Sequence, residues 1–478
     1  MKDINKDKIK VLCYLHQDSG RDVEILLPVI YYLETYLNSV VDVAFIYDIH
    51  AIYRKKPDIV LIATNAIGSI LHHKVAKYSA ENGIPVFALI SEGNFRTDGT
   101  FNYWGHNTDK KFYQEYLCMW SKRTYDYFVN ELPQYKDKIV ITGATGFDRY
   151  KIYKFPERLQ ILKKYNLQGY KKVIMYAGWA FGKLFNEIGL NDIITLHKDN
   201  AVKHIEWMKV QMRFVEESLR YVIERNPDIL FILKRHPSEK APHLMQPDKN
   251  EMVNLIDYPN VLYLVEEEKI HDIISISDIL LGFETTTAVE SWLMNKNRPT
   301  IFINQDVNFN RDINYKGTLI AKNGKELQQY ISEFYQIGSI KAFHAEKLEK
   351  ARKEIIKSII GFDDGMNHIR TGYYLNKTIN KVKHTNSKTK VNINWTYFGM
   401  YILMHVGKYF YSKKLFIKLP KFKKTIWIFE RCNLIGFSNN KQVAYKYLDE
   451  FHEKNAIRLK IGDKEFWKNL LINENDKV

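Results

Sequence analysis

Short apolar runs alternate with amphipathic helical segments along most of this chain, and that alternation limits the possible folds more than any other feature. The runs are apolar at consecutive positions rather than at every second one. Strands of this kind are buried on both faces, which is typical of parallel sheets covered by helices on both sides. We therefore predict an α/β fold. In the first third of the chain the predicted strands are 8–14, 41–47, 58–63, 84–90, 116–120 and 138–142.

The same alternation starts again after a polar stretch near residues 150–169, so the chain carries two series of strands. A chain of 478 residues is also too long for one ordinary domain. We predict two Rossmann-like domains that face a cleft, at residues 1–160 and 161–380, and a different segment at 381–478. Residues 327–360 are predicted to be mostly helical. The predicted strands of the second series are 171–176, 229–234, 261–264, 278–282 and 299–304.

The formal net charge of +16 is concentrated in one region. Residues 381–431 hold eleven lysines and Arg431 against a single acid, Glu430, which gives +11. The same region contains the aromatic-rich stretch 394–411. Aromatic and aliphatic side chains interleaved with lysines suit the surface of an anionic bilayer, and they equally suit a helical appendage packed on the main body. Both interpretations stay open. Nucleic acid is not expected as a partner, because the basic region lies apart from the residues that look catalytic.

The cysteine pattern and the N-terminal sequence indicate a reducing compartment. The three cysteines, Cys13, Cys118 and Cys432, form no CxxC pair or Cys/His cluster, so neither a disulfide framework nor a zinc site is expected. The first residues are charged and lead straight into a predicted strand, without the apolar core of a signal peptide. No run of about 18 apolar residues predicts a transmembrane helix. We expect a cytoplasmic protein, with the inner face of the cell membrane as an additional location.

Polar residues suited to a phosphate follow two strands of the second series. An Arg-His-Pro turn comes directly after strand 229–234, and a run of three threonines opens a helix after strand 278–282. Open α/β sheets bind ligands at the carboxyl ends of their strands, and helix N-termini favour anions. We also expect the glycine after strand 171–176 to let backbone approach a ligand, and the glutamate one turn into the helix to bind a ribose. The residues predicted to bind a nucleotide or phosphate ligand are Gly178, Trp179, Arg235, His236, Thr285, Thr286, Thr287 and Glu290.

Two polar, glycine-containing loops of the first series, 16–22 and 91–99, offer carboxylates. Each loop follows the carboxyl end of a predicted strand, so we expect both to face the cleft. A carboxylate there suits a general base, which makes Asp18, Glu92 and Asp98 the candidates. No Asp-x-Asp pair occurs in the chain, so the usual ligands of a metal–diphosphate complex are missing. We therefore predict a reaction without a metal, in which arginine, histidine and helix dipoles stabilise the leaving phosphate.

Several short motifs resemble those of bacterial surface-carbohydrate enzymes with the GT-B architecture, namely CMP-ulosonic-acid transferases and CDP-glycerol or CDP-ribitol phosphotransferases. The resemblance covers residues 8–375 and leaves the basic tail uncovered. Ala144 and Thr145 replace the commoner residues of one motif, and threonines stand where serines are common, so the nucleotide is left open. The matching pieces are Arg21-Asp22, Thr142 to Asp148, Lys234 to Pro237, Ser277-Asp278 with Thr285 to Thr287 and Glu290, Asn295 to Pro299, and Asp364-Gly365 with Arg370.

This resemblance implies a glycosyltransferase that moves a sugar from a nucleotide donor to a surface polysaccharide, capsule or lipopolysaccharide acceptor, with no cofactor beyond the nucleotide sugar. A CMP-linked acidic sugar is the favoured donor, because a single donor phosphate needs no metal clamp. Two alternatives stay open. One is a CDP-glycerol- or CDP-ribitol-type polyol-phosphate transferase of teichoic-acid-like polymer synthesis, and the other is a non-catalytic nucleotide- or glycan-binding protein of a cell-surface assembly.

Overall fold

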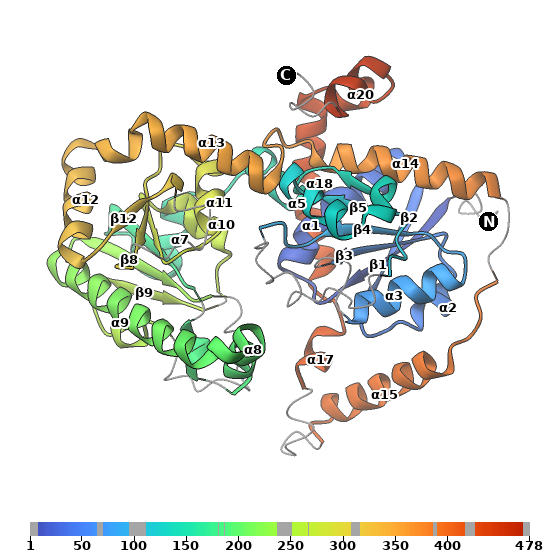
Figure 1. The fold of residues 1–478 in the computed structure, drawn as a ribbon, viewed down its shortest axis with the longest axis horizontal. Helices are drawn as coiled ribbons and strands as arrows, with labels where there is room; N and C mark the ends of the chain where they lie inside the picture. The colour runs from blue at the N-terminus through green and yellow to red at the C-terminus, as the bar shows by residue number, and fades with distance from the viewer. Residues whose placement is uncertain are drawn as a thin grey trace. The chain divides into compact units, whose positions relative to one another are not determined.

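The structure of the protein, a computed structural model, divides into two compact units (Figure 1). Unit 1 consists of Met1–Tyr153 together with Lys357–Val478, and unit 2 is Lys154–Ile356. Each unit is built around its own parallel sheet. The residues that the structure describes are 8–64, 70–94, 111–179, 181–185, 187–236, 251–265, 267–306, 316–385, 390–415 and 426–471.

Unit 1 contains a six-stranded parallel sheet in the order β2-β1-β3-β4-β5-β6. The two strands at its centre, β3 and β4, are buried along their whole length, as their unbroken apolar sequences predict. Helices connect the strands and cover the sheet. The N-terminal elements of unit 1 are β1 (Ile9–Leu15), α1 (Arg21–Tyr36), β2 (Ser39–Phe45), α2 (Ala51–Lys55), β3 (Ile59–Thr64), α3 (Ile70–Glu81), β4 (Val86–Ile90), β5 (Tyr116–Met119), α5 (Lys122–Glu131), β6 (Ile139–Ile141) and α6 (Arg149–Ile152).

Unit 2 repeats this plan with a six-stranded parallel sheet in the order β12-β11-β10-β7-β8-β9. Its core lies between the sheet and the helices on either side, and α10 and α7 pack on the residues of β7 and β8. The elements are α7 (Arg158–Lys164), β7 (Lys172–Ala177), α8 (Glu187–His197), α9 (Ala201–Arg225), β8 (Ile229–Lys234), β9 (Val261–Leu264), α10 (Ile270–Ile276), β10 (Ile279–Gly282), α11 (Thr287–Met294), β11 (Thr300–Ile303), β12 (Leu319–Ala321), α12 (Gly324–Ile337) and α13 (Glu346–Ile360).

The predicted α/β class with two parallel sheets is confirmed, and every predicted strand lies within two residues of an observed one. One strand, β12, was not predicted, because three residues are too few to show a pattern. The stretch 327–360, predicted to be mostly helical, contains the two helices α12 and α13. The first of them ends at Gly338, whose φ of 77° is left-handed and closes the helix at its C-cap.

The chain returns to unit 1 at Lys357, in the last turn of α13, so the structure divides it differently from the predicted boundaries at 160 and 380. Residues 357–380 and the basic tail belong with the first sheet. The reason is packing on α1: both α14 and α18 lie against it, and Tyr32 of α1 shares a buried cluster with Ile369 and Leu470. The C-terminal elements of unit 1 are α14 (Asn367–Thr385), α15 (Trp395–Ser412), α17 (Ile426–Arg431), α18 (Phe437–Lys454), α19 (Ile457–Lys460) and α20 (Lys464–Leu471).

A buried polar chain runs from Asp148 into the returning helices. The carboxylate of Asp148 accepts hydrogen bonds from the backbone N–H groups of Asn367 (3.1 Å) and His368 (2.9 Å) at the start of α14. It also contacts Nδ1 of His368 at 2.8 Å. The other ring nitrogen of His368 lies 2.7 Å from Nε2 of His452 on α18, and Nδ1 of His452 lies 2.6 Å from the hydroxyl of Tyr36. This series of hydrogen bonds connects α1, the N-cap of α6, α14 and α18 of unit 1.

Two of the sequence motifs, 142–148 and 364–370, meet beside these hydrogen bonds. The guanidinium of Arg370 donates to both oxygens of Asp364, at 2.8 and 2.6 Å, and its Nε donates to the carbonyl of Leu470 at 3.0 Å. Gly143 has a φ of 84°, and a Cβ at that position would lie 1.9 Å from Oδ1 of Asn367. The segments 142–148 and 364–370, which were singled out by resemblance, therefore hold the return of the chain onto unit 1.

We expect the free energy of unfolding to fall as the pH drops below the ordinary histidine pKa of 6.5. Burial, and then His368, lowers the pKa of His452 to about 2. The folded protein therefore keeps His452 neutral while the unfolded chain takes up a proton. The stability that is complete above pH 6.5 is lost progressively as the pH falls towards the folded-state pKa, by about 1.4 kcal/mol per pH unit for one such group.

Urea unfolding at a series of pH values measures the slope of the free energy of unfolding against pH. Burial also lowers the pKa of His72, so some slope will persist without His452. In the His452→Gln variant the slope should become shallower, whatever the variant's absolute stability. An identical slope in the two proteins would contradict the assignment.

Candidate functional site

The sheet of unit 2 has a topological switch between β7 and β10. From β7 the chain adds β8 and then β9 on one side, and it then crosses to place β10 on the other side of β7. In open parallel sheets, the carboxyl ends at such a switch are where ligands bind. The rings of Trp179, after β7, and Phe283, after β10, lie 5.1 Å apart, so the two turns are in contact.

The turn after β8 places a buried arginine at this edge. Arg235 is only 9% exposed, and its backbone N–H donates to the carbonyl of Leu264 at 2.9 Å. Its Nε is buried and has no hydrogen-bond partner among the residues that the structure describes. A buried donor without an acceptor is costly, and an anion is the strongest acceptor for a guanidinium. His236 follows it and is partly buried, whereas Pro237 lies outside the described residues.

Gly178 is required because the backbone of residues 234–236 and the side chain of Glu251 both approach it closely. Its N–H donates to the carbonyl of Lys234 at 2.9 Å, and a Cβ at Gly178 would lie 2.8 Å from the backbone nitrogen of His236. The same Cβ would lie 2.1 Å from Oε1 of Glu251. The predicted role of Gly178, close approach of backbone, is therefore filled at least in part by the protein itself.

The side chain of Glu251 lies at the turn after β7, and its place in the site was not predicted from the sequence. It is 1% exposed, and its carboxylate accepts hydrogen bonds from the N–H groups of Trp179 (3.0 Å) and Phe181 (2.8 Å). These backbone donors thus form an anion-binding turn that already holds a carboxylate. No sequence signal marks Glu251, because it is an isolated acid outside any motif.

The three threonines after β10 divide between two environments. Thr285 and Thr287 are buried, and the Thr285 hydroxyl donates to that of Thr287 at 3.0 Å while accepting the Thr287 N–H at 3.2 Å. Thr286 is the N-cap residue of α11, is partly exposed, and makes no side-chain cap bond. Glu290 lies in the first turn of α11 and is partly exposed. Thr286 is therefore the threonine whose side chain is best placed for a ligand.

An aromatic cluster lies beside the switch. The ring of Phe283 lies 5.2 Å from Phe181 and 5.8 Å from Trp207 of α9, in addition to its contact with Trp179. Trp207 also donates from Nε1 to Asp306, after β11, at 3.3 Å. Sequence reasoning missed Trp207, because an aromatic residue on an amphipathic helix is typical of core packing. The cluster gives this edge of the sheet flat apolar surfaces as well as a buried cation.

Of the three predicted bases in unit 1, two are held by neighbouring groups. The carboxylate of Asp18 accepts the N–H of Gly436, the N-cap residue of α18, at 2.7 Å, which is a structural contact. Glu92 forms an ion pair with Arg21. Asp98 lies outside the described residues. The structure therefore gives Asp18 and Glu92 partners within unit 1, and it does not test Asp98.

His16 is a further polar residue at the corresponding edge of the unit 1 sheet. It follows β1, next to the switch between β1 and β3, and its ring lies 4.9 Å from that of His72. Burial lowers the pKa of His16, with Arg431 adding to this effect and Asp22 opposing it. Its imidazole is therefore neutral near pH 7 and can accept a proton. The sequence places His16 in the polar loop 16–22, where Asp18 is the more evident candidate for a base.

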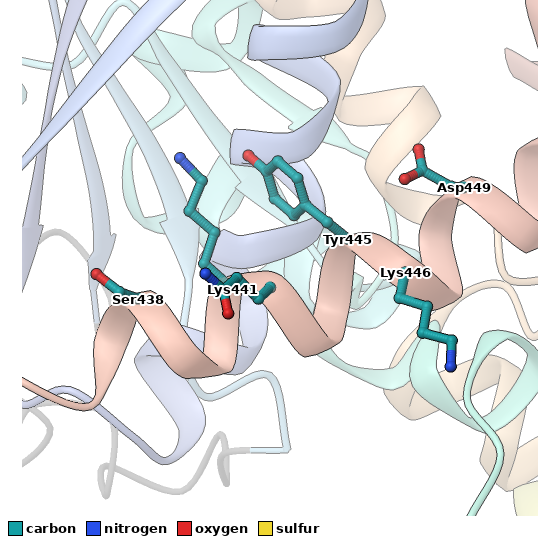
Figure 2. A pocket seen from close by; sticks show the side chains of 6 residues that line it. Ser438, Lys441, Tyr445, Lys446 and Asp449 are labelled. Atoms are coloured by element: carbon teal, nitrogen blue, oxygen red, sulfur yellow. The ribbon is translucent and has the colours of Figure 1, made fainter.

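A shallow hollow runs along α18 and is a different kind of feature. Figure 2 shows that Lys441 and Tyr445 extend from the helix in one direction and Lys446 in another. Lys441 pairs with Glu34 of α1 at 2.8 Å, and Tyr445 also donates to Glu34. These groups hold α18 on α1, so the hollow is a seam of helix packing rather than a candidate site. Its lining is Ser438, Lys441, Gln442, Tyr445, Lys446 and Asp449.

No family model matches the chain, and no curated protein matches its sequence. Solved structures do match its fold. The chain is similar to a UDP-N-acetylglucosamine 2-epimerase, with a TM-score of 0.51 at 13% identity, over 81% of this chain and 100% of the other. It is also similar to S. aureus MnaA in complex with UDP, with a TM-score of 0.50 at 15% identity, over 78% and 97%.

A glycosyltransferase from Rickettsia africae is similar as well, with a TM-score of 0.44 at 14% identity, over 80% of this chain and 100% of the other. Identities this low establish the fold alone. Two parallel α/β units of the GT-B type are therefore shown for this chain.

Proposed function

We propose that the chain is a glycosyltransferase that takes a sugar from a nucleotide-linked donor, without a metal ion, and adds it to a bacterial surface glycan. The observation that carries the proposal is Arg235, whose buried Nε–H no described residue accepts, at a strand end beside the switch of unit 2. A donor phosphate would supply the missing acceptor and pair with the guanidinium.

The surroundings of Arg235 suit the rest of a nucleotide. Trp179 is partly exposed next to the aromatic cluster and offers a face for a base. The hydroxyl of Thr286 and the N-terminus of α11 favour a phosphate, and Glu290 would bind the ribose. A CMP-linked acidic sugar remains our favoured donor, because one phosphate needs one cation and no diphosphate clamp. The proposed acceptor is a capsule, lipopolysaccharide or related surface polysaccharide.

In the proposed reaction the acceptor hydroxyl oxygen forms a bond to the anomeric carbon of the sugar. The bond from that carbon to the phosphate oxygen breaks, and the nucleotide leaves with the bonding electrons. Arg235 and the helix dipole of α11 stabilise the leaving phosphate. The acceptor's proton goes to a general base, for which Glu92 and Asp98 remain the candidates predicted from the sequence and His16 is a further one. Asp18 is the weakest of the predicted bases, because its carboxylate binds the N-cap of α18.

Thermal stabilisation by CMP, CDP, UDP and GDP tests the nucleotide. We expect CMP to give the largest rise in melting temperature, and the Arg235→Ala variant to lose that rise. Turnover of CMP-linked acidic sugars, measured by the release of CMP, should persist in excess EDTA. If the purified protein binds none of the four nucleotides, the donor proposal fails.

Other outcomes would assign a different reaction. Preferential stabilisation by CDP, with transfer of a polyol phosphate, would favour the teichoic-acid type of enzyme. Stabilisation by UDP, together with inversion of UDP-N-acetylglucosamine at carbon 2 in the absence of any acceptor, would assign the activity that gives the structurally similar epimerases their name. If EDTA abolishes the activity and added Mg²⁺ restores it, the metal-independent mechanism is overturned.

A further inference from the structure

Helix α15 has one face packed on unit 1. Phe398 and Tyr401 both contact the ring of His50, at 5.2 and 5.4 Å, and Arg54 of α2 lies 4.6 Å over the ring of Tyr401. Tyr397 contacts Tyr78 of α3 at 5.2 Å. In Figure 1, α15 is the orange-red helix that lies apart from the sheet strands, beyond α2 and α3. The helix is therefore held by its aromatic side chains.

Both ends of α15 are also fixed. Before the helix, the Asn392 N–H donates to Oδ1 of Asn82 at 2.8 Å, and the hydroxyl of Tyr78 donates to the Asn392 carbonyl at 2.5 Å. Near its other end, Gly407 packs so closely on Phe429 of α17 that a Cβ would lie 2.4 Å from the ring. These contacts determine which face of α15 turns outward.

The outward face is apolar. Trp395 and Leu403 are 71% and 72% exposed, and Tyr409 is 59% exposed. The spacing of these three residues and of Ile402 and Val406 places all five on one side of the helix. Exposed apolar groups this close together mark interaction surfaces rather than ordinary protein surface. We call this face the apolar stripe, and it consists of Trp395, Ile402, Leu403, Val406 and Tyr409.

The charge around the stripe has one sign. No aspartate or glutamate occurs between residues 381 and 429, and the region 381–431 carries +11. Lys413 and Lys414 are exposed directly after the helix, and Lys408 is partly exposed within it. Tryptophan and tyrosine, which prefer the boundary between lipid and water, lie at the two ends of the stripe. No helix among the described residues is long and apolar enough to cross a membrane.

We propose that α15 docks the protein onto an anionic lipid bilayer, lying in the plane of the interface with the apolar stripe inserted and the lysines at the headgroups. Charge and apolar exposure together select this occupant: a neutral or basic partner surface would leave the lysines without counter-charges, whereas an anionic leaflet supplies counter-charges and also an apolar layer for the stripe. The contacts with α2 and α3 keep the stripe presented before any lipid arrives, so binding requires no refolding of the helix.

Co-sedimentation of the full chain with vesicles measures this docking without any substrate. We expect binding to vesicles of phosphatidylcholine mixed with phosphatidylglycerol, and much weaker binding to phosphatidylcholine alone. Raising the salt from about 0.05 to 0.5 M should weaken it, because the Debye length shortens. The tryptophan emission should also shift to the blue on binding, and this shift should shrink in Trp395→Phe.

A charge-matched pair of variants isolates the stripe. Leu403→Glu with Val406→Glu should reduce the apparent affinity about tenfold or more, because two inserted apolar side chains are lost. Val443→Glu with Leu459→Glu adds the same charge at exposed apolar positions of α18 and α19, and should bind nearly as wild type. All four positions are exposed, and equal melting temperatures would confirm that both variants fold.

Three results would overturn the proposal. One is equal binding by both variants and wild type, and another is an equal loss in both variants, which would make net charge the only cause. The third is a wild-type protein that does not bind vesicles but dimerises in solution and becomes monomeric on Leu403→Glu with Val406→Glu. In that case a second copy of the chain, rather than lipid, covers the stripe.

Discussion

Replacement of Arg235 by alanine is expected to lower kcat/KM for the nucleotide-linked donor by about 100- to 1000-fold, the usual effect of removing one group that stabilises the leaving charge. Arg235 is buried, and no described residue accepts its Nε–H, so its loss should cost the folded protein little. Steady-state kinetics with release of the nucleotide measure the change. Arg235→Lys keeps the charge but not the two-pronged geometry, and should recover only part of the rate.

Arg225→Ala is the matched control, because Arg225 is an exposed arginine of unit 2 at the C-terminal end of α9, which leads to the opposite edge of the sheet. It should turn over donor as wild type does. His236→Ala should also lose turnover with the fold intact, and that result would argue against a non-catalytic binding protein. Full activity in Arg235→Ala would remove this edge of unit 2 as the donor site.

Replacement of Asp148 by alanine is expected to destabilise unit 1 by about 3–5 kcal/mol, because it leaves buried donors of α14 and His368 without their acceptor. Asp148→Asn keeps the size and one carbonyl oxygen and should lose less. Because the two units need not unfold together, hydrogen–deuterium exchange resolved by peptide is the suitable measurement. It should show faster exchange in α14 and α18 and unchanged exchange in the strands of unit 2.

Asp126→Asn provides the comparison for a surface carboxylate. Asp126 pairs with Lys122 on α5, and both side chains are about half exposed, so its loss should change stability by less than about 1 kcal/mol. Similar exchange in Asp148→Ala and in Asp126→Asn would show that the buried chain from Asp148 to Tyr36 does not hold unit 1 together.

The strands could be predicted from the sequence, but which segments of the chain make up each unit could not. Apolar runs such as 229–234 have a length and composition that determine local structure, and they matched the strands. The return of the chain depends on contacts such as Asp148 with His368, which are 220 residues apart. No periodicity reveals a contact at that distance. The motifs around Asp148 and Asp364 are visible in the sequence, but only the structure shows that they lie together.

The candidate site was predictable where residues follow strand ends. The position of Arg235 follows from the strand before it, and its burial without an acceptor was not foreseeable from sequence. Glu251 and Trp207 reach the same edge from an irregular segment and from a helix, and neither position has a distinctive pattern. In unit 1 the carboxylate of Asp18 looked like a base, because its partner Gly436 lies 418 residues away in the chain.

Unit 2 interrupts unit 1, and this has a consequence for synthesis on the ribosome. Unit 2 is continuous, so it can finish folding soon after α13 leaves the exit tunnel. The sheet of unit 1 is complete much earlier, but α14 follows Asp148 by 219 residues, which is about 10–45 s of translation at ordinary rates. During that interval α1 lacks the helices that cover Tyr32. A nascent unit 1 is therefore a candidate client for chaperones, while unit 2 folds without waiting.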